Sequence, residues 1–92
     1  MVNLDGKKDY VIKFYADWCA PCKVLAPRVA EVSKETGIEV VSVNIDEESE
    51  FAQKYGVRGI PMLVAVKDDA PIGALTGART KDEVTELFLK VR

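Results

Sequence analysis

The chain has two cysteines, and both fall in the segment DWCAPCK, residues 17–23. A pair with two intervening residues suits three roles: a dithiol redox centre, two ligands of a metal site, or two thiols packed in a core. A disulfide between Cys19 and Cys22 would close a very short loop and would stabilise the fold little as a cross-link. The surrounding sequence has to decide among these roles.

Composition argues against a metal site and against several classes of protein. There is no histidine, and a tetrahedral zinc site needs four ligands, so only a dimer that shared two cysteine pairs would build one. We therefore predict no metal. A net charge of −2 disfavours nucleic acid as a partner, and no apolar run approaches the roughly 20 residues of a membrane span. The N-terminus shows no apolar signal core, so we expect a cytoplasmic protein, where disulfides are more often catalytic than structural.

Hydrophobic patterning predicts one α/β domain spanning residues 1–92, with the order β-α-β-α-β-β-α. Its βαβ start implies parallel strands, and the short turn between the last two strands implies antiparallel pairing. The result is a mixed four-stranded sheet flanked by three helices. The expected strands are 10–15, 38–45, 62–67 and 72–76; the expected helices are 21–36, 47–55 with Asp46 as its cap, and one after Thr80, whose capping box includes Glu83.

The predicted elements place the cysteines where a buried strand ends and a helix begins. Cys19 falls near the helix N-cap, where free N–H groups and the helix dipole favour a thiolate, which is the nucleophilic form. Cys22 should lie one turn deeper, within disulfide reach and less exposed. This asymmetry suits dithiol exchange, in which Cys19 attacks a substrate disulfide and Cys22 resolves the mixed disulfide. Trp18 would cover the site with an apolar face.

Several motifs together resemble the thioredoxin family. Residues 18–23 match its signature WCGPCK, with Ala20 in place of glycine. The segments 44–46 and 55–61, Pro27, and the Gly77-Ala78 pair also resemble that family, in the same order along the chain. The resemblance runs from about Val11 to the C-terminus and implies the thioredoxin fold.

The resemblance also implies a set of site residues and partners. It implies a cis peptide at Ile60–Pro61 beside the cysteines, in a loop that offers backbone groups to an extended substrate segment. The residues expected to bind substrate are Trp18, Pro21, Gly59, Ile60, Pro61, Gly77 and Ala78. The implied partners are disulfide-containing proteins and a thioredoxin reductase, with no cofactor beyond a redox-active Cys19–Cys22 disulfide.

The sequence thus favours a thiol–disulfide oxidoreductase that reduces protein disulfides, and two alternatives stay open. One is a thioredoxin-fold subunit that binds a partner, with redox activity incidental. The other is a glutaredoxin-like, glutathione-dependent reductase. The segment Ala20-Pro21 argues against the latter, because that family usually has a tyrosine between its cysteines.

Two departures from the family pattern lie outside the motif. Only nine residues precede Tyr10, too few for the family's additional strand and helix, so whether they add a short fifth strand stays open. The strand at 38–45 should then be a sheet edge; a monomer is expected, with an edge-strand dimer as the alternative. Lys13 stands where the family usually has a buried aspartate, and Ser42 where lysine is common. Lys13 would favour thiolates, accept a proton when neutral, or only pack its stem while its ammonium reaches water.

Overall fold

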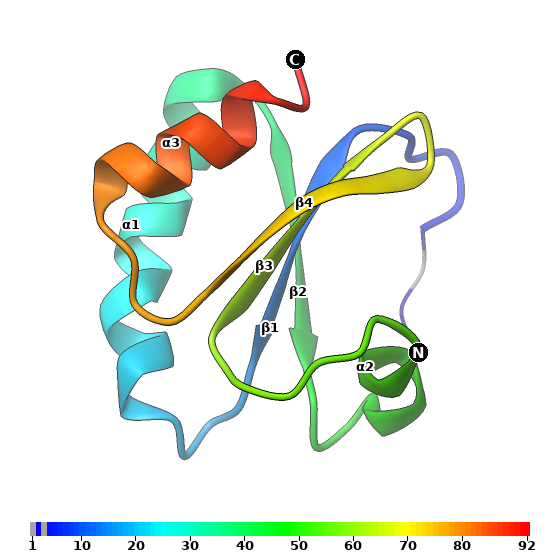
Figure 1. Ribbon diagram of the computed structural model, residues 1–92, viewed down its shortest axis with the longest axis vertical. Helices are drawn as coiled ribbons and strands as arrows, with labels where there is room; N and C mark the ends of the chain where they lie inside the picture. The colour runs from blue at the N-terminus through cyan, green and yellow to red at the C-terminus, as the bar shows by residue number, and fades with distance from the viewer. Residues whose placement is uncertain (1, 3) are drawn as a thin grey trace.

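A computed structural model describes residues 2 and 4–92 (Figure 1). These residues form a four-stranded sheet and three helices in the predicted order, so the predicted architecture is confirmed. The strands are β1 (Tyr10–Tyr15), β2 (Glu39–Asn44), β3 (Met62–Lys67) and β4 (Ala70–Thr76). The helices are α1 (Ala20–Thr36), α2 (Ser49–Lys54) and α3 (Lys81–Leu89).

The sheet has the strand order β2-β1-β3-β4 and is mixed, as predicted. Strand β1 pairs parallel with β2, while β3 runs antiparallel to both β1 and β4. Because β1 is central and covered on both faces, its apolar residues are almost fully buried, whereas Lys13 and Tyr15 are partly exposed. The carboxyl ends of β1 and β2 lie at the same end of the sheet, where the cysteines follow β1.

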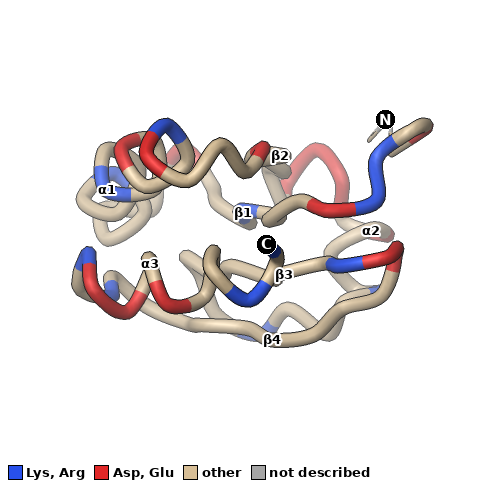
Figure 2. The backbone as a smooth tube through the Cα atoms, turned by 90° about the horizontal axis from the view of Figure 1, so that it is seen from above, with Lys and Arg blue, Asp and Glu red and all other residues tan. Residues whose placement is uncertain are grey.

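Helices cover the two faces of the sheet unequally. Figure 2 shows α1 and α3 on one side and α2 on the other. The longer pair covers the cluster that includes Val11, Leu25, Leu63 and Phe88. The six-residue α2 covers part of the opposite cluster, and Leu4 from the N-terminal segment also packs there.

The N-terminal segment forms no strand at residues 2 and 4–9, so the short fifth strand is absent from this part of the chain. Residues 1 and 3 lie outside the described residues. The segment turns instead: Gly6 has a positive φ of 78°, and the N–H of Lys7 bonds to the carbonyl of Leu4. Strand β2 is an edge of the sheet, as predicted, and Lys7 forms an ion pair with Glu39 at its start.

The predicted start of β4 was wrong. Strand β4 begins at Ala70 and not at Ile72, because the turn is only two residues long: Asp68 and Asp69 both adopt positive φ, as a tight hairpin requires. Pro71 is tolerated because β4 is a sheet edge.

Helix α2 is also shorter than predicted, and Asp46 does not cap it. Its N-cap is Glu48, without a side-chain cap bond. The chain first makes a turn in which the N–H groups of Glu47 and Glu48 bond to the carbonyl of Asn44, so the helix starts later. The Asp46 carboxylate bonds instead to Trp18.

Candidate active site

The cysteines lie between β1 and α1, as predicted. Cys19 is the N-cap of α1 and has an extended backbone conformation. At the other end of the helix, Gly37 is the C-cap and has a left-handed conformation. Its sulfur accepts a hydrogen bond from the N–H of Cys22 at 3.2 Å, and its own N–H bonds to the carbonyl of Ala16. A donor N–H and the positive end of a 17-residue helix both favour a thiolate at Cys19.

Cys19 and Cys22 form a disulfide, with their Cα atoms 5.3 Å apart. The predicted difference in exposure is wrong for this oxidised form, since Cys19 is 4% exposed and Cys22 5%. Both sulfurs belong to one small buried cluster against which Tyr15, Ile45 and Ile60 pack. The difference between the cysteines therefore lies in the side chains around each of them.

An apolar groove adjoins Trp18 on one side of the disulfide. We call it the apolar groove; it is lined by Trp18, Ile45, Val57, Arg58, Gly59 and Ile60. Trp18 is 69% exposed, so it is no core residue, and its indole N–H donates to the Asp46 carboxylate at 2.9 Å. That bond holds an exposed aromatic ring next to Cys19 in the chain.

The loop after α2 supplies the far wall of this groove. The Ile60–Pro61 peptide is cis, as the resemblance implied. The carbonyl of Pro61 accepts a hydrogen bond from the N–H of Gly77, whose φ of 95° is one that glycine adopts readily. The predicted residues Trp18, Gly59 and Ile60 are thus brought together, and Gly77 is tied to Pro61. Pro21 and Ala78 are exposed at the start of α1 and after β4, outside the residues that line the groove.

Sequence reasoning missed three residues of this groove, Ile45, Val57 and Arg58. It also missed Asp46, the hydrogen-bond partner of Trp18. A usable signal existed for Asp46. It follows β2, which runs parallel to β1, so it emerges at the same end of the sheet as the cysteine segment.

A crevice with charged walls lies on the other side of the disulfide. We call it the charged crevice; it is lined by Lys13, Tyr15, Ala16, Asp17, Cys22, Lys23, Ala26 and Ser42. Lys13 is half-buried and its ammonium lies 5.5 Å from the centre of the Tyr15 ring, a cation–π arrangement. Burial lowers the pKa of the Lys13 ammonium from its ordinary value of 10.5.

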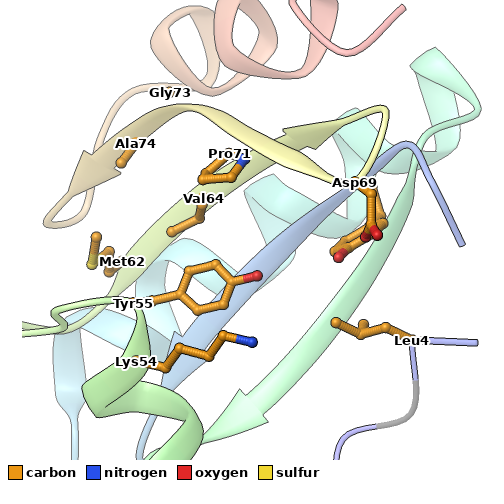
Figure 3. Close-up of a pocket in the computed structure, with 10 residues that line it drawn as sticks. Leu4, Lys54, Tyr55, Met62, Val64, Asp69, Pro71, Gly73 and Ala74 are labelled. Atoms are coloured by element: carbon orange, nitrogen blue, oxygen red, sulfur yellow. The ribbon is translucent and has the colours of Figure 1, made fainter.

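A large cavity lies away from both cysteines. Figure 3 shows it between α2 and the β3–β4 hairpin, with Tyr55, Lys54 and Val64 projecting around it. Tyr10 also lines it, and burial, with further contributions from Tyr55 and Asp69, raises the pKa of the Tyr10 phenol to about 12. This cavity was not predicted from the sequence, because it forms only where α2 leaves part of the sheet face uncovered.

Residues 2 and 4–92 hold no cluster of three or more histidine, cysteine, aspartate or glutamate side chains placed to bind a metal ion. No helix in this part of the chain has the length and apolar character needed to cross a membrane.

Comparison with known proteins identifies the family of this chain. The thioredoxin family model matches residues 2–90. The chain belongs to the thioredoxin family. Among curated relatives, a thioredoxin from Buchnera aphidicola is 38% identical over 92 residues, covering 95% of this chain and 84% of its own length. A Bacillus subtilis thioredoxin is 39% identical over 79 residues, covering 84% of this chain and 76% of its own length.

Solved thioredoxin structures agree in fold. A thioredoxin variant from Halobacterium salinarum superposes with a TM-score of 0.86 at 33% identity, covering 91% of this chain and 74% of that one. Reduced thioredoxin from Schistosoma mansoni gives 0.85 at 33% identity, covering 92% of this chain and 80% of that one.

Family membership and the close cysteine pair identify this protein as a thiol–disulfide oxidoreductase. They favour that interpretation over a binding subunit and over a glutaredoxin-like reductase. Thioredoxins need no added cofactor, and the redox group here is the Cys19–Cys22 disulfide.

Proposed function

We propose that this protein reduces disulfides in other proteins, with Cys19 as the attacking thiolate and Cys22 as the resolving thiol. The observation that carries the proposal is the position of Cys19 at the N-cap of α1, with the N–H of Cys22 directed at its sulfur. The helix terminus stabilises negative charge at that atom, and the apolar groove beside it offers a place for the substrate.

The reaction proceeds by two exchanges of sulfur–sulfur bonds. The Cys19 thiolate attacks one sulfur of the substrate disulfide, which forms a mixed disulfide and releases the other substrate sulfur as a thiolate. Cys22 then loses its proton and attacks the sulfur of Cys19. The mixed disulfide breaks, the second substrate sulfur leaves as a thiolate, and the Cys19–Cys22 disulfide forms. Two electrons pass to the substrate, and the proton of Cys22 passes to solvent or to a released thiolate.

The substrate segment is proposed to lie extended along the apolar groove. Gly59 and Ile60 border it, and Gly59 brings no side chain that would keep a second backbone at a distance. Trp18 covers the segment with its exposed ring. From the family resemblance, Pro21, Pro61, Gly77 and Ala78 complete the surface around it.

The proposed partners are disulfide-containing proteins and a thioredoxin reductase that returns the disulfide to the dithiol. A reducing compartment such as the cytoplasm suits this cycle, since its reductants regenerate dithiols. The net charge of −2 speaks against nucleic acid as a partner. A monomer is the proposed state, because the Lys7–Glu39 ion pair places charges on the β2 edge and charge disfavours edge pairing.

A turnover assay tests the proposal. With a dithiol as electron source and a protein disulfide as substrate, Cys19→Ser should reduce the rate at least a thousandfold, to the rate of the dithiol itself, because the attacking atom is gone. Val24→Ala, an exposed change on α1, is the matched control and should keep the full rate. Turnover that survives in Cys19→Ser would refute the proposal and favour a binding role.

A further inference from the structure

Lys13 occupies the middle of a longer depression between α1 and the β1–β2 pair. The charged crevice adjoins a second cavity, and the two share Lys13, Ala26 and Ser42. The second cavity continues past Val40 to Glu39 at the exposed β2 edge. Cys22 is buried, yet it lines the first cavity together with the lysine. The side of Cys22 away from the apolar groove therefore faces a space that contains a cationic side chain and opens toward the edge of the sheet.

Charged groups surround Lys13, but none of the described carboxylates is close enough to neutralise its ammonium. Among residues 2 and 4–92, no carboxylate lies within ion-pair distance of Lys13. The titratable groups that face the two cavities are Tyr15 on β1, Asp17 in the following loop, Cys22 and Lys23 on α1, and Glu39 on β2. Asp17 and Lys23 are exposed and opposite in sign, so solvent screens them and their fields oppose each other. Glu39 is paired with Lys7.

We propose that the Lys13 ammonium stabilises the thiolate of Cys22, which shifts the dithiol–disulfide equilibrium of this protein toward the dithiol. The proposal rests on the proposed function, in which Cys22 is the resolving thiol. A half-buried cation attracts a nearby anion more strongly than an exposed one does, since less water screens the pair. Reduction breaks the Cys19–Cys22 bond with two electrons, and any interaction that stabilises the resulting thiolates makes the protein a weaker reductant and a stronger oxidant.

The same charge has a kinetic consequence. Cys22 must lose its proton before it attacks the sulfur of Cys19 and releases the substrate. A cation beside Cys22 favours that loss, and the proton leaves through the depression toward solvent. Lys13 acts here through the reacting sulfur, as a residue that sets the charge state of Cys22.

Redox equilibration against glutathione tests this inference, with Lys13→Met compared with Lys13→Arg. Methionine keeps an unbranched stem and removes the charge, whereas arginine retains the charge. At pH 7, Lys13→Met should shift the equilibrium constant about tenfold toward the disulfide, or about 30 mV for this two-electron couple. Lys13→Arg should stay within threefold of the unmodified protein. Lys23→Met, an exposed lysine at the same crevice, is the matched control and should change the constant less than twofold.

A pH series separates charge from packing. The difference between the unmodified protein and Lys13→Met should be present while the lysine is charged and disappear in strongly alkaline buffer. Burial lowers the pKa of Lys13 from its ordinary value of 10.5, so the lysine becomes neutral at a lower pH than an exposed lysine does. Equal constants for Lys13→Met and the unmodified protein at pH 7, or a pH-independent difference, would overturn the inference. Failure of the proposed function would appear separately, as turnover retained in Cys19→Ser.

Discussion

The two sides of the disulfide differ in nearly every physical property. The apolar groove beside Trp18 contains one charged side chain, Arg58, and it carries an exposed aromatic ring fixed by Asp46. The charged crevice beside Cys22 contains two lysines and an aspartate and adjoins a second cavity that extends toward a sheet edge. We propose that one side contacts a substrate and that the other controls the charge on a buried sulfur.

The two cysteines are almost equally buried, and we propose that this difference in surroundings gives them separate tasks. Substrate recognition needs apolar surface and accessible backbone, both of which the groove offers near Cys19. Proton loss and redox poise depend on charge and solvent access, which the crevice offers near Cys22. Changes on the groove side should therefore alter substrate affinity, and removal of the half-buried Lys13 charge on the crevice side should alter the redox equilibrium.

Substitutions in the apolar groove should have the largest effect, and this effect should differ between a protein disulfide and a small disulfide. Trp18→Ala combined with Ile60→Ala should lower kcat/KM for a protein disulfide about a hundredfold, since buried aromatic and aliphatic contacts often contribute 1–2 kcal/mol each. The rate with a small soluble disulfide should change less than threefold, because that reagent does not need the groove. Stopped-flow kinetics with both substrates measures the two rates.

Trp18→Phe serves as the graded variant in the same experiment. It keeps an aromatic ring and removes the hydrogen bond to Asp46, so its effect should be about fivefold. Equal losses with the protein and the small disulfide would contradict the division of tasks, because they would place the groove residues in the chemistry itself.

A change far from the disulfide should alter stability and leave both sides of the site untouched. The pKa of the Tyr10 phenol is about 12 in the folded protein and near 10 in the unfolded chain. The protonated Tyr10 phenol therefore contributes fully to the free energy of unfolding below pH 10. This contribution is lost as pH rises to 12, and the free energy of unfolding decreases by about 3 kcal/mol.

Urea unfolding at pH 9 and pH 12 checks this, with Tyr10→Phe as the comparison. The variant should lack this part of the alkaline decrease and keep an unchanged equilibrium with glutathione. An alkaline decrease of the same size in both proteins would show that Tyr10 does not carry it, and a shifted glutathione equilibrium would show that the far end of the sheet influences the disulfide.

Much of the fold followed from local patterns in the sequence. The apolar run of β1, the Gly37 stop of α1 and the capping box of Thr80 and Glu83 each specify an element through nearby residues, and all three are present. The start of α2 did not follow, because the turn held by the Asn44 carbonyl takes the place of a cap at Asp46.

The site was predictable to the extent that its residues are neighbours in sequence. Cys19, Cys22 and Trp18 lie in one segment, and the cis peptide at Pro61 came from the family resemblance. The bond from Trp18 to Asp46 spans 28 residues, and the crevice joins Lys13 to Ser42 from another strand. Such contacts depend on the register of β1 and β2, in which Lys13 stands opposite Ser42, and the sequence does not state that register.

Covalent trapping tests the division between the two cysteines most directly. Cys22→Ser should accumulate a mixed disulfide between Cys19 and a substrate protein, because the resolving atom is missing, and intact-mass spectrometry should find most of the protein in that form. Cys19→Ser should accumulate none under the same conditions. A stable adduct on Cys22 in Cys19→Ser, with none in Cys22→Ser, would reverse the roles and contradict the account.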